Sequence, residues 1–237
     1  MAKNLLYYKI YEYYKNMIHT NQLRSGQKMP TEQEVCKIFN ASRITTRHAF
    51  ELLANEGLIV KVQGKGTFIC EKKADMQLNF LQGFSAEMSS IGKQPSTILL
   101  GVQLTHPTKE IMELLNLSEG GMIYVIERIR CADEVKMAYE KVHLPFHIAS
   151  NIEKHDLTKS LYSILESVYH IYPVWAKQTL EATLANSTQA AYLDVKVNSP
   201  LLRIKRLSYD QNNRPYEYTE SLYRGDKYKF TVTMNRN

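Results

Sequence analysis

Residues Met29 to Ile69 read MPTEQEVCKIFNASRITTRHAFELLANEGLIVKVQGKGTFI, and their pattern predicts the architecture of the N-terminal part of the chain. Thr31 is a helix-capping residue, and Glu34 follows three positions later, which is the spacing of a capping box. Apolar residues then recur at intervals of three and four, so a short helix with one apolar face is predicted. We expect it to end shortly before Ser42, which is placed to cap a second helix.

The second predicted helix combines a buried stripe with a basic face. Its expected core positions, at the spacing i, i+3, i+4, i+7, are Thr46, Ala49, Phe50 and Leu53. Arg43 and Arg47 lie one turn apart on another face, with Ile44 and His48 beside them. Two short helices joined by a tight turn, the second with basic residues near its start, are typical of a helix-turn-helix. Its second helix enters the major groove.

Two short β-rich runs follow this helix. Residues 58–62 and 67–70 are joined through Gly64, Lys65 and Gly66, which predicts a hairpin with a small, positively charged tip. Glycine lets a backbone approach DNA closely, and lysine can meet a phosphate. The two helices and the hairpin together predict a winged helix-turn-helix.

The formal charge is divided unevenly along the 237-residue chain. Residues 1–73 hold twelve Lys and Arg against six Asp and Glu, whereas residues 74–237 hold eighteen of each. The whole net charge of +6 therefore belongs to the part with the helix-turn-helix pattern, as phosphate binding requires. The composition, 44% hydrophobic and 23% charged, is that of a folded protein with room for two domains.

The three cysteines, Cys36, Cys70 and Cys131, are widely spaced and form no CxxC pair. We expect neither a disulfide nor a zinc site, and no cofactor. No apolar run approaches the roughly 20 residues that span a bilayer, and the N-terminus lacks the apolar core of a signal peptide. The chain is therefore expected in the cytoplasm, without a membrane partner.

The motifs PTEQEV, ASRITTRHAFELLANEGLI and GKGTF resemble the DNA-binding domain of GntR-type bacterial transcription regulators, from about Leu5 to Phe68. The resemblance implies that Arg43 reads a base and that Thr45 and Arg47 lie near the DNA backbone. Gln33 stands where many relatives have arginine, which bears on the operator sequence. The positions expected to contact DNA are Thr31, Gln33, Ser42, Arg43, Thr45, Arg47, His48, Lys65 and Gly66.

A polar stretch without periodicity, residues 71–77, separates the two parts of the chain. We expect a winged-helix domain over residues 1–73, a linker over 74–78 and a second domain over 79–237. A tyrosine-rich helix over residues 4–20 is predicted to pack its apolar face on the other helices of the first domain.

The second domain alternates helix and strand signals. Helices are expected over 85–91, 108–117, 160–169 and 188–193, and strands over 96–104, 122–131, 135–144, 174–185, 201–209, 215–223 and 227–234. The helix and hairpin at 108–144 resemble those at 188–223 as a weak repeat, which places Glu140 and Glu217 equivalently. We predict an α+β fold in which one antiparallel sheet carries helices on one side, with a ligand cleft between the two copies.

Arg128 and Arg130 fall on the same face of one predicted strand. Two arginines on a largely apolar strand require a carboxylate or a bound anion. They therefore predict either a structural pair with Glu140 or another acid, or an anion clamp. Helix starts at Ser85 and Ser160 offer amides and hydroxyls to the same anion. Carboxylates at the other end of the cleft suit the hydroxyls of a sugar phosphate.

The motifs VIERIR, MAYEKVHLPF, SLYSIL and PYEYTESLYRGDKYKF resemble the UTRA effector-binding domain of the HutC subgroup, over about residues 78–235. This fold is similar to that of chorismate lyase, and the members most similar in these motifs are repressors of amino-sugar use that sense hexosamine 6-phosphates. The resemblance implies phosphate contacts for the Phe84 and Ser85 amides, Arg128, Arg130, Ser160, Tyr162 and Tyr228, and sugar contacts for Glu140 and Glu217. Glu220 stands where sugar-phosphate sensors often carry a basic or small residue, which leaves the sugar open.

Together these patterns predict a DNA-binding repressor, not an enzyme, whose operator affinity is controlled by a small anionic metabolite such as a sugar phosphate. We expect a homodimer, formed through the second domains, on a palindromic double-stranded operator with half-sites about one DNA turn apart. Three alternatives stay open: a non-phosphorylated organic acid as effector, a chorismate-lyase-like enzyme, and a nonspecific nucleoid or RNA binder. No nucleophile–base pair, metal-ligand spacing or Gly-rich phosphate loop in the sequence supports the enzyme.

Overall fold

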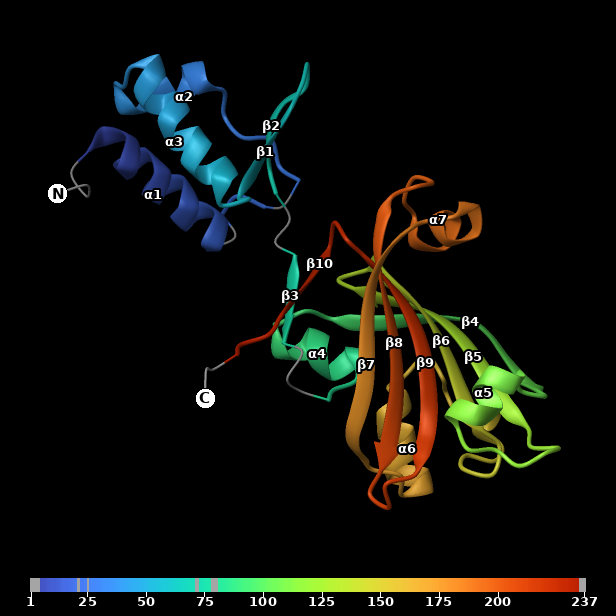
Figure 1. The fold of residues 1–237 in the computed structure, drawn as a ribbon. Helices are drawn as coiled ribbons and strands as arrows, with labels where there is room; N and C mark the ends of the chain where they lie inside the picture. Colours follow the sequence, from blue (N-terminus) through green and yellow to red (C-terminus); the bar gives the residue numbers. More distant parts are fainter. Residues whose placement is uncertain (1–4, 21, 25, 71–72, 78–80, 235–237) are drawn as a thin grey trace. The chain divides into compact units, whose positions relative to one another are not determined.

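The structure, a computed structural model, describes residues 5–20, 22–24, 26–70, 73–77 and 81–234 (Figure 1). Internal contacts divide the chain into two compact units, unit 1 over Met1–Lys72 and unit 2 over Lys73–Asn237. Residue 4 of the expected first helix, residue 78 of the expected linker and the expected outer limits of both domains lie outside the described residues.

Unit 1 contains, within its described residues, three helices and a hairpin. Their bounds are α1 Leu6–His19, α2 Glu32–Phe39, α3 Arg43–Asn55, β1 Ile59–Val62 and β2 Gly66–Ile69. The hairpin strands pair antiparallel from Ile59↔Ile69 to Val62↔Gly66. One core joins all five elements, because Ile10, Val35 and Leu53 from the three helices are buried together with Ile69 from the hairpin. This arrangement is the winged helix-turn-helix that the sequence predicts.

Both helices of the helix-turn-helix begin as their sequences indicate. The hydroxyl of Thr31 accepts a hydrogen bond from the Glu34 amide at 3.2 Å, and the Glu34 carboxylate accepts one from the Thr31 amide at 2.7 Å. The Ser42 hydroxyl accepts a hydrogen bond from the Thr45 amide at 3.1 Å. Asn40, with φ at 47°, ends α2 in the left-handed conformation that asparagine tolerates.

Unit 2 is built on an antiparallel sheet of six strands in the order β4-β5-β6-β9-β8-β7. The strands are β4 Pro95–Thr105, β5 Ile123–Ala132, β6 Val135–Pro145, β7 Pro173–Leu184, β8 Pro200–Asp210 and β9 Pro215–Arg224. The helices of the described part are α4 Phe84–Ser90, α5 Lys109–Leu114, α6 Leu161–Tyr169 and α7 Ser187–Leu193, with a 3-10 turn at Ile152–Lys154.

The predicted internal repeat appears as two sheet halves that meet at β6 and β9. Each half consists of a long strand, a helix and a hairpin (β4, α5, β5 and β6; then β7, α7, β8 and β9). Val142 of the first copy corresponds to Thr219 of the second copy, and these two residues pair with each other in the antiparallel register of β6 and β9. Glu140 and Glu217 each lie two residues before a member of this pair, so both carboxylates are on the same face.

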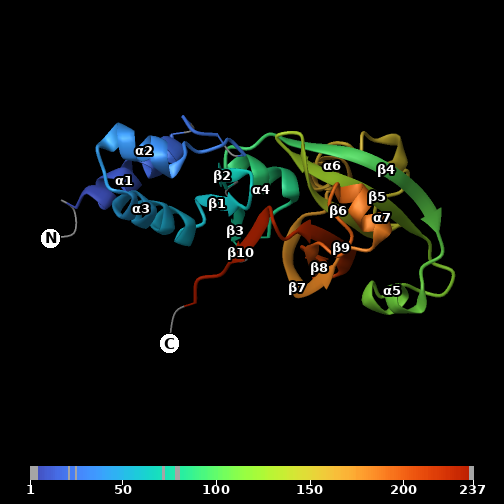
Figure 2. The ribbon, with the colours of Figure 1, turned by 90° about the horizontal axis from the view of Figure 1, so that it is seen from above.

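Helices cover both faces of the sheet, which corrects the expectation of helices on one side. The repeat helices α5 and α7 pack on one face, against Tyr218 and Leu222 of β9 respectively. On the opposite face α6 packs against β5 and β6, and α4 packs near Ile204 and Tyr223 (Figures 1 and 2). The repeat accounts for only one layer of helices, because α4 and α6 have no equivalents in it.

The expected linker and the last expected strand differ from the structure. Ala74–Gln77 form strand β3, which pairs in parallel with β10, Tyr228–Thr231, in a separate two-stranded sheet. Residues 227–234 therefore do not close the main sheet. Ser85 was expected to cap a helix, but α4 begins at Phe84 with Gly83 in the capping position. No helix in the described part of the chain is long and apolar enough to cross a membrane.

Candidate functional sites

The second helix of the helix-turn-helix, α3, turns its basic face to solvent. Arg43 and Arg47 are exposed, and Ile44 between them is 83% exposed, whereas the predicted stripe from Thr46 to Leu53 is buried. Arg43 forms no hydrogen bond or ion pair with another described residue. Its guanidinium is therefore available to a base edge or a phosphate.

Glu32 on α2 lies between two cations of unit 1. Its carboxylate is 3.7 Å from Nε of Arg47 and 3.3 Å from Nζ of Lys61. The side chains of Arg47 and Lys61 are 64% and 77% exposed, so each pair contributes at most about 1 kcal/mol. Both cations can exchange Glu32 for a DNA phosphate at small cost.

The other expected DNA-contacting side chains of the two helices are partly engaged within unit 1. The hydroxyls of Ser42 and Thr45 are 2.7 Å apart, and the Thr31 hydroxyl belongs to the capping box. His48 is exposed and stacks on Tyr7 of α1, with ring centroids 4.2 Å apart. Gln33 is exposed on α2. The structure thus places these residues on the surface of unit 1, with three hydroxyls committed to helix starts.

The wing tip depends on glycine. Gly66 has φ at +117°, and a Cβ built there would lie 2.7 Å from Cε of Lys28. Gly64 also has positive φ, at +74°. L-residues rarely adopt these conformations, so the turn that exposes Lys65 needs both glycines.

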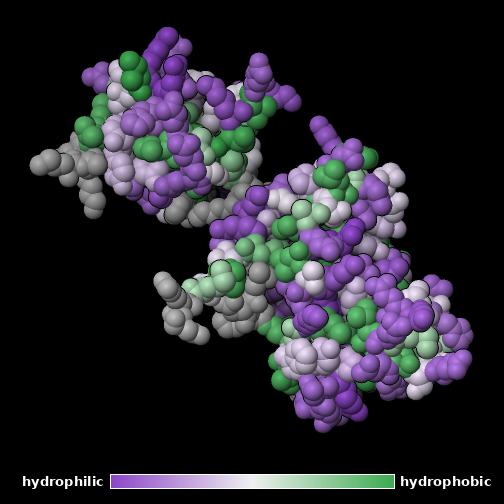
Figure 3. Space-filling view, viewed as in Figure 1, coloured by the Kyte–Doolittle hydropathy of each residue, from purple (hydrophilic) through white to green (hydrophobic). Residues whose placement is uncertain are grey.

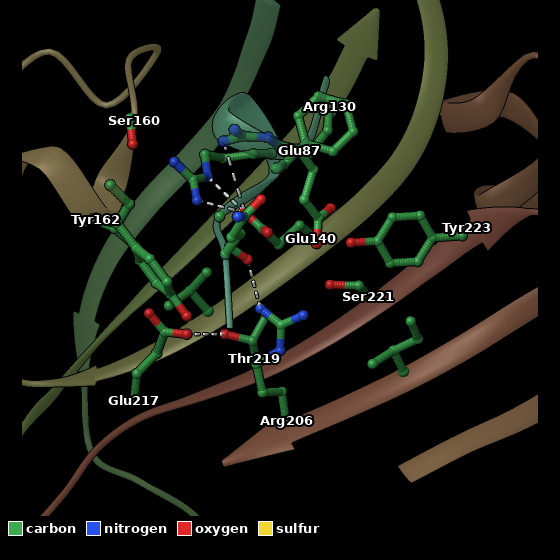
Figure 4. A pocket seen from close by; sticks show the side chains of 17 residues that line it. Glu87, Arg130, Glu140, Ser160, Tyr162, Arg206, Glu217, Thr219, Ser221 and Tyr223 are labelled. Atoms are coloured by element: carbon green, nitrogen blue, oxygen red, sulfur yellow. Dashed lines mark hydrogen bonds and ion pairs between the residues drawn. The ribbon is translucent and has the colours of Figure 1, made fainter. Parts of the chain in front are cut away.

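A pocket lies on the sheet face that α4 and α6 cover (Figure 4). Its free volume is about 40 Å³. The lining includes seven of the nine residues that the sequence assigns to an effector: Phe84, Arg128, Arg130, Glu140, Ser160, Tyr162 and Glu217. The alternation of the strands accounts for this convergence, because every second residue of β5, β6 and β9 faces the pocket.

Arg128 forms the structural pair that was one of the two interpretations of the arginines. Its Nε donates to the Glu140 carboxylate at 3.0 Å, its Nη2 donates to the same carboxylate, and Nη1 donates to the Lys159 carbonyl at 3.5 Å. Burial alone would raise the pKa of Glu140, but the charges of Arg128 and Arg130 outweigh it and lower the pKa. The pair is therefore ionised, and Arg128 is occupied within the protein.

Arg130 has fewer partners. Its Nη2 donates to the Ser85 hydroxyl at 3.1 Å, and its guanidinium carbon lies 4.9 Å from the centroid of the Phe84 ring. Nη1 is 3.9 Å from the Glu140 carboxylate, beyond hydrogen-bond distance. The side chain is 4% exposed, yet neither Nε nor Nη1 has a hydrogen-bond partner among the described residues. A buried donor without a partner costs about 1–3 kcal/mol, which an anion in the pocket would recover.

Glu217 differs from its repeat equivalent Glu140 because it lacks an arginine. In the strand register Arg128 is opposite Glu140, whereas Ser208 is opposite Glu217. One carboxylate oxygen of Glu217 accepts a hydrogen bond from the Thr219 hydroxyl at 2.8 Å, and Oε2 has no partner among the described residues. Burial raises the pKa of Glu217 to about 7. The group is therefore partly protonated near neutral pH and can donate or accept a hydrogen bond.

The helix α6 presents two expected residues to the pocket. Ser160 caps its first turn by accepting a hydrogen bond from the Ser163 amide at 3.3 Å. The Tyr162 hydroxyl is buried and has no hydrogen bond of ordinary geometry within the described residues, although Ser208 and Arg206 lie close enough to affect its pKa. Burial raises that pKa, so the phenol stays neutral.

Two expected effector residues do not line the pocket. Ser85 does not line the pocket itself, but its hydroxyl accepts a hydrogen bond from Arg130, which does. Tyr228 is buried under α4, where its hydroxyl donates to Sδ of Met88 at 3.8 Å. Ser85 thus contacts the lining residue Arg130, and Tyr228 contacts the lining residue Tyr223, whose ring centroid is 4.5 Å from its own.

Sequence reasoning missed several lining residues, which are Gln82, Gly83, Glu87, Val142, Leu161, Ile204, Arg206, Thr219, Ser221 and Tyr223. Arg206 is the most important of these, because it brings a third guanidinium to the pocket. Its Nε donates to Gln178 at 2.8 Å and its Nη1 to the Gln82 carbonyl at 3.2 Å. Alternation along the repeat strand β8, which pairs with the strand of Glu217, was the available signal.

Known protein families match both units. A model of the UTRA domain matches residues 90–229, and a model of the bacterial regulatory proteins of the gntR family matches residues 6–69. The chain is 35% identical over 231 residues to the HTH-type transcriptional repressor NagR of Bacillus subtilis, with 98% of this chain and 95% of that protein covered. It is 26% identical over 237 residues to a probable fructoselysine utilization operon transcriptional repressor of Shigella flexneri, with 100% and 97% covered.

The fold is also similar to the crystal structure of PhnF from Mycobacterium smegmatis, with a TM-score of 0.77 and 24% identity over 96% of this chain and 99% of that one. The relatives by sequence are named as transcriptional regulators and not as enzymes. Both resemblances that the motifs indicated are thereby confirmed. The chain belongs to the GntR family of bacterial DNA-binding transcription regulators, in the HutC subgroup whose members carry a UTRA effector domain.

Proposed function

We propose that this protein is a repressor that binds a palindromic operator as a homodimer and responds to a phosphorylated sugar in the pocket of unit 2. Two relatives that match nearly the whole chain are named as repressors, and one of them is named for the utilization of fructoselysine, a sugar derivative. A sugar-derived effector is consistent with that name.

The unpaired donors of Arg130 carry the assignment of an anionic group. Arg128 is neutralised by Glu140, whereas Nε and Nη1 of the buried Arg130 have no hydrogen-bond acceptor among the described residues. A phosphate offers several acceptor oxygens and matches the fork of a guanidinium. The Ser160 hydroxyl lines the same pocket and can donate to the phosphate as well.

The carboxyl groups support a polyol as the rest of the ligand. Among the described residues, one carboxylate oxygen of Glu217 has no partner, and the Tyr162 hydroxyl has no hydrogen bond of ordinary geometry. Sugar hydroxyls both donate and accept, so they can satisfy a partly protonated carboxyl and a phenol together. A ligand with an anionic end and hydroxyls at the other end fits this distribution.

Binding would require the pocket to widen. A free volume of about 40 Å³ holds a few water molecules, and a whole sugar phosphate needs more space. We infer that the helix α4 moves in this widening, because Phe84 and Glu87 of α4 border the pocket. A ligand that prefers the widened state shifts the population of unit 2 and thereby its influence on DNA binding.

The edge strands of the sheet support self-association of unit 2. On β4 the side chains of Ile98 and Leu104 are 48% and 44% exposed, and on β7 those of Val174 and Leu184 are 59% and 60% exposed. Exposed apolar side chains on long edge strands are a liability unless another surface covers them. A second copy of the chain would cover them and provide two recognition helices for a two-fold operator.

A thermal-shift comparison of the wild-type protein with defined ligands tests the proposal. The panel is glucosamine 6-phosphate, N-acetylglucosamine 6-phosphate, glucosamine, inorganic phosphate and citrate. We expect at least one sugar phosphate to raise the unfolding temperature of unit 2. At a ligand concentration of a hundred times Kd, the free energy of unfolding should rise by about 2.7 kcal/mol. The same ligand should change operator affinity. Stabilisation by citrate alone would contradict the sugar phosphate and favour an organic acid.

A further inference from the structure

Ile44 stands out on the surface of unit 1 because of its exposure and its place. It is the second residue of α3, and its side chain is 83% exposed, more than any other large hydrophobic side chain in the described part of unit 1. On the part of unit 1 visible in Figure 3, hydrophobic residues lie scattered among hydrophilic ones. Ile44 adds nothing to the core of this unit, so packing does not explain it.

The geometry of α3 places Ile44 at the centre of the face that leaves the protein. With about 100° per residue, position 44 is roughly opposite the stripe formed by Thr46, Ala49 and Leu53. Arg43 precedes it and Arg47 follows within one turn. A helix with this face towards DNA brings its first turn deepest into the major groove.

The same face is unsuited to DNA further along the helix. Glu51, two turns after Ile44, is exposed and carries a negative charge that repels phosphates. Contact with base edges is therefore concentrated in the first turns, where Ile44 lies beside Arg43 and Arg47. Ile44 has no donor or acceptor, and the only apolar group that a base pair presents in the major groove is the C5 methyl of thymine.

We infer that Ile44 is a specificity-determining residue that packs on the C5 methyl of one thymine in each half-site of the operator. The inference rests on the DNA-binding function of the family and adds an apolar contact to the hydrogen bonding expected of Arg43. A β-branched side chain in a helix has one strongly preferred χ1 rotamer, so Ile44 has little χ1 freedom to lose when it meets DNA. Its contact therefore carries little additional entropy cost.

The experiment removes single methyl groups from DNA. The full-length wild-type protein first selects its preferred sequence from a random double-stranded library. Each thymine of that sequence is then replaced by deoxyuridine, which differs only by the absent C5 methyl, and affinities are measured for the wild type and for Ile44→Ala. The matched control is Ile38→Ala, which removes an isoleucine that is 64% exposed on α2.

At one position in each half-site we expect deoxyuridine to weaken wild-type binding by about threefold to tenfold, the effect of roughly one buried methyl group. At that position Ile44→Ala should bind the thymine and the deoxyuridine DNA with equal affinity. Ile44→Val should show a smaller loss of affinity with deoxyuridine than the wild type does, and Ile38→Ala should show the same loss as the wild type. The variants should keep the wild-type unfolding temperature, because both side chains are exposed.

Two results would overturn the inference. One is that no thymine position is sensitive to deoxyuridine in the wild type, and the other is that Ile44→Ala shows the same sensitivity as the wild type. A selection that converges on no sequence would overturn both this inference and operator-specific binding. That failure is recognisable before any variant is measured.

Discussion

Arg128 and Arg130 lie two residues apart on β5 and face the same pocket, yet they have different tasks. Arg128 is bound by the Glu140 carboxylate, and removal of either partner would leave a buried charge unpaired, at a cost of about 3–5 kcal/mol. Two donors of Arg130 have no partner in the part of the chain that the structure describes. A variant at position 128 would therefore mix loss of folding with loss of binding, and position 130 is the better site for a test.

We predict that Arg130→Gln abolishes the stabilisation by the sugar phosphate that binds the wild type, while operator affinity without ligand stays the same. The reason is the loss of Nε and Nη1, the two donors without a partner among the described residues, whereas glutamine keeps a planar polar group on a shorter side chain. Thermal shift and DNA-binding titrations measure the two effects. The control is Arg203→Gln on β8, whose arginine pairs with Glu181 at 3.9 Å and does not line the pocket. An unchanged ligand response in Arg130→Gln would remove Arg130 from the site.

Glu217 makes stability depend on pH. Burial raises its pKa from 4.5 to about 7, so the folded state holds its proton more tightly than the unfolded state does. The contribution of this group to the free energy of unfolding is therefore most favourable below about pH 4.5. It decreases as the pH rises from there through about 7, and above that the full cost of ionising the buried carboxyl is present. With about 1.4 kcal/mol for each pKa unit, the penalty is about 3 kcal/mol.

We predict that Glu217→Gln is more stable than the wild type at pH 8 by up to about 3 kcal/mol, and that the difference vanishes near pH 4.5. Denaturant unfolding at a series of pH values measures it. Glu119→Gln, in an exposed turn, is the matched control and should leave the profile unchanged. A difference that is constant from pH 4.5 to 8 would show that Glu217 does not titrate in this range.

At the scale of elements, the starts of α2 and α3 set the geometry of the DNA-binding surface. The Thr31–Glu34 capping box and the Ser42 cap fix both helices by local hydrogen bonds that their sequences encode. The wing depends on Gly66, whose φ of +117° is a conformation that residues with a Cβ rarely adopt. The sequence indicated these elements because caps and turns depend on neighbouring residues.

For the capping box we predict that Thr31→Ala destabilises unit 1 by about 1 kcal/mol, because the Glu34 amide loses its acceptor. Glu34→Gln is the matched control and should cost little, since glutamine can also complete a capping box. Denaturant unfolding followed by a probe in unit 1 compares the two. No loss in Thr31→Ala would contradict the prediction, and equal losses in both variants would show that the charge of Glu34 matters as much to the helix start as the hydroxyl of Thr31.

The whole molecule consists of two units with separate cores. The core of unit 1 joins its helices to the wing, and the cores of unit 2 lie on the two faces of its sheet. In the described part of the chain the unit boundary directly precedes β3, which belongs to unit 2 through its pairing with β10. Each unit therefore has the interactions needed to unfold separately.

We predict two transitions in calorimetry of the full chain. Thr31→Ala should lower only the transition of unit 1, and the sugar phosphate should raise the transition of unit 2 in the absence of DNA, because each change acts on one core. A single transition that moves equally with both changes would show that the units unfold as one. Any shift of unit 1 by the ligand would measure their coupling, for which about 1–3 kcal/mol is typical of allosteric proteins.

Features that depend on neighbouring residues were predictable from the sequence, and features that depend on contacts between distant segments were not. Alternation placed Arg128, Arg130 and Glu140 on one face, and the weak repeat placed Glu217 beside them, all of which the structure brings into one pocket. Alternation did not reveal that Arg128 forms a hydrogen-bonded ion pair with Glu140 while Arg130 does not. That difference depends on a register between two strands, which no short motif encodes.

The winged helix-turn-helix, the α+β character of the second unit and the residues of its strands that face one side follow from local sequence, because caps, turns and periodicity act over a few neighbouring residues. The helices on both faces of the sheet, the pairing of β3 with β10, and the entry of Arg206 and Glu87 into the pocket become visible only in the folded chain. These features arise from packing between segments far apart in the chain, and their free energy depends on burial and partners that exist only after folding.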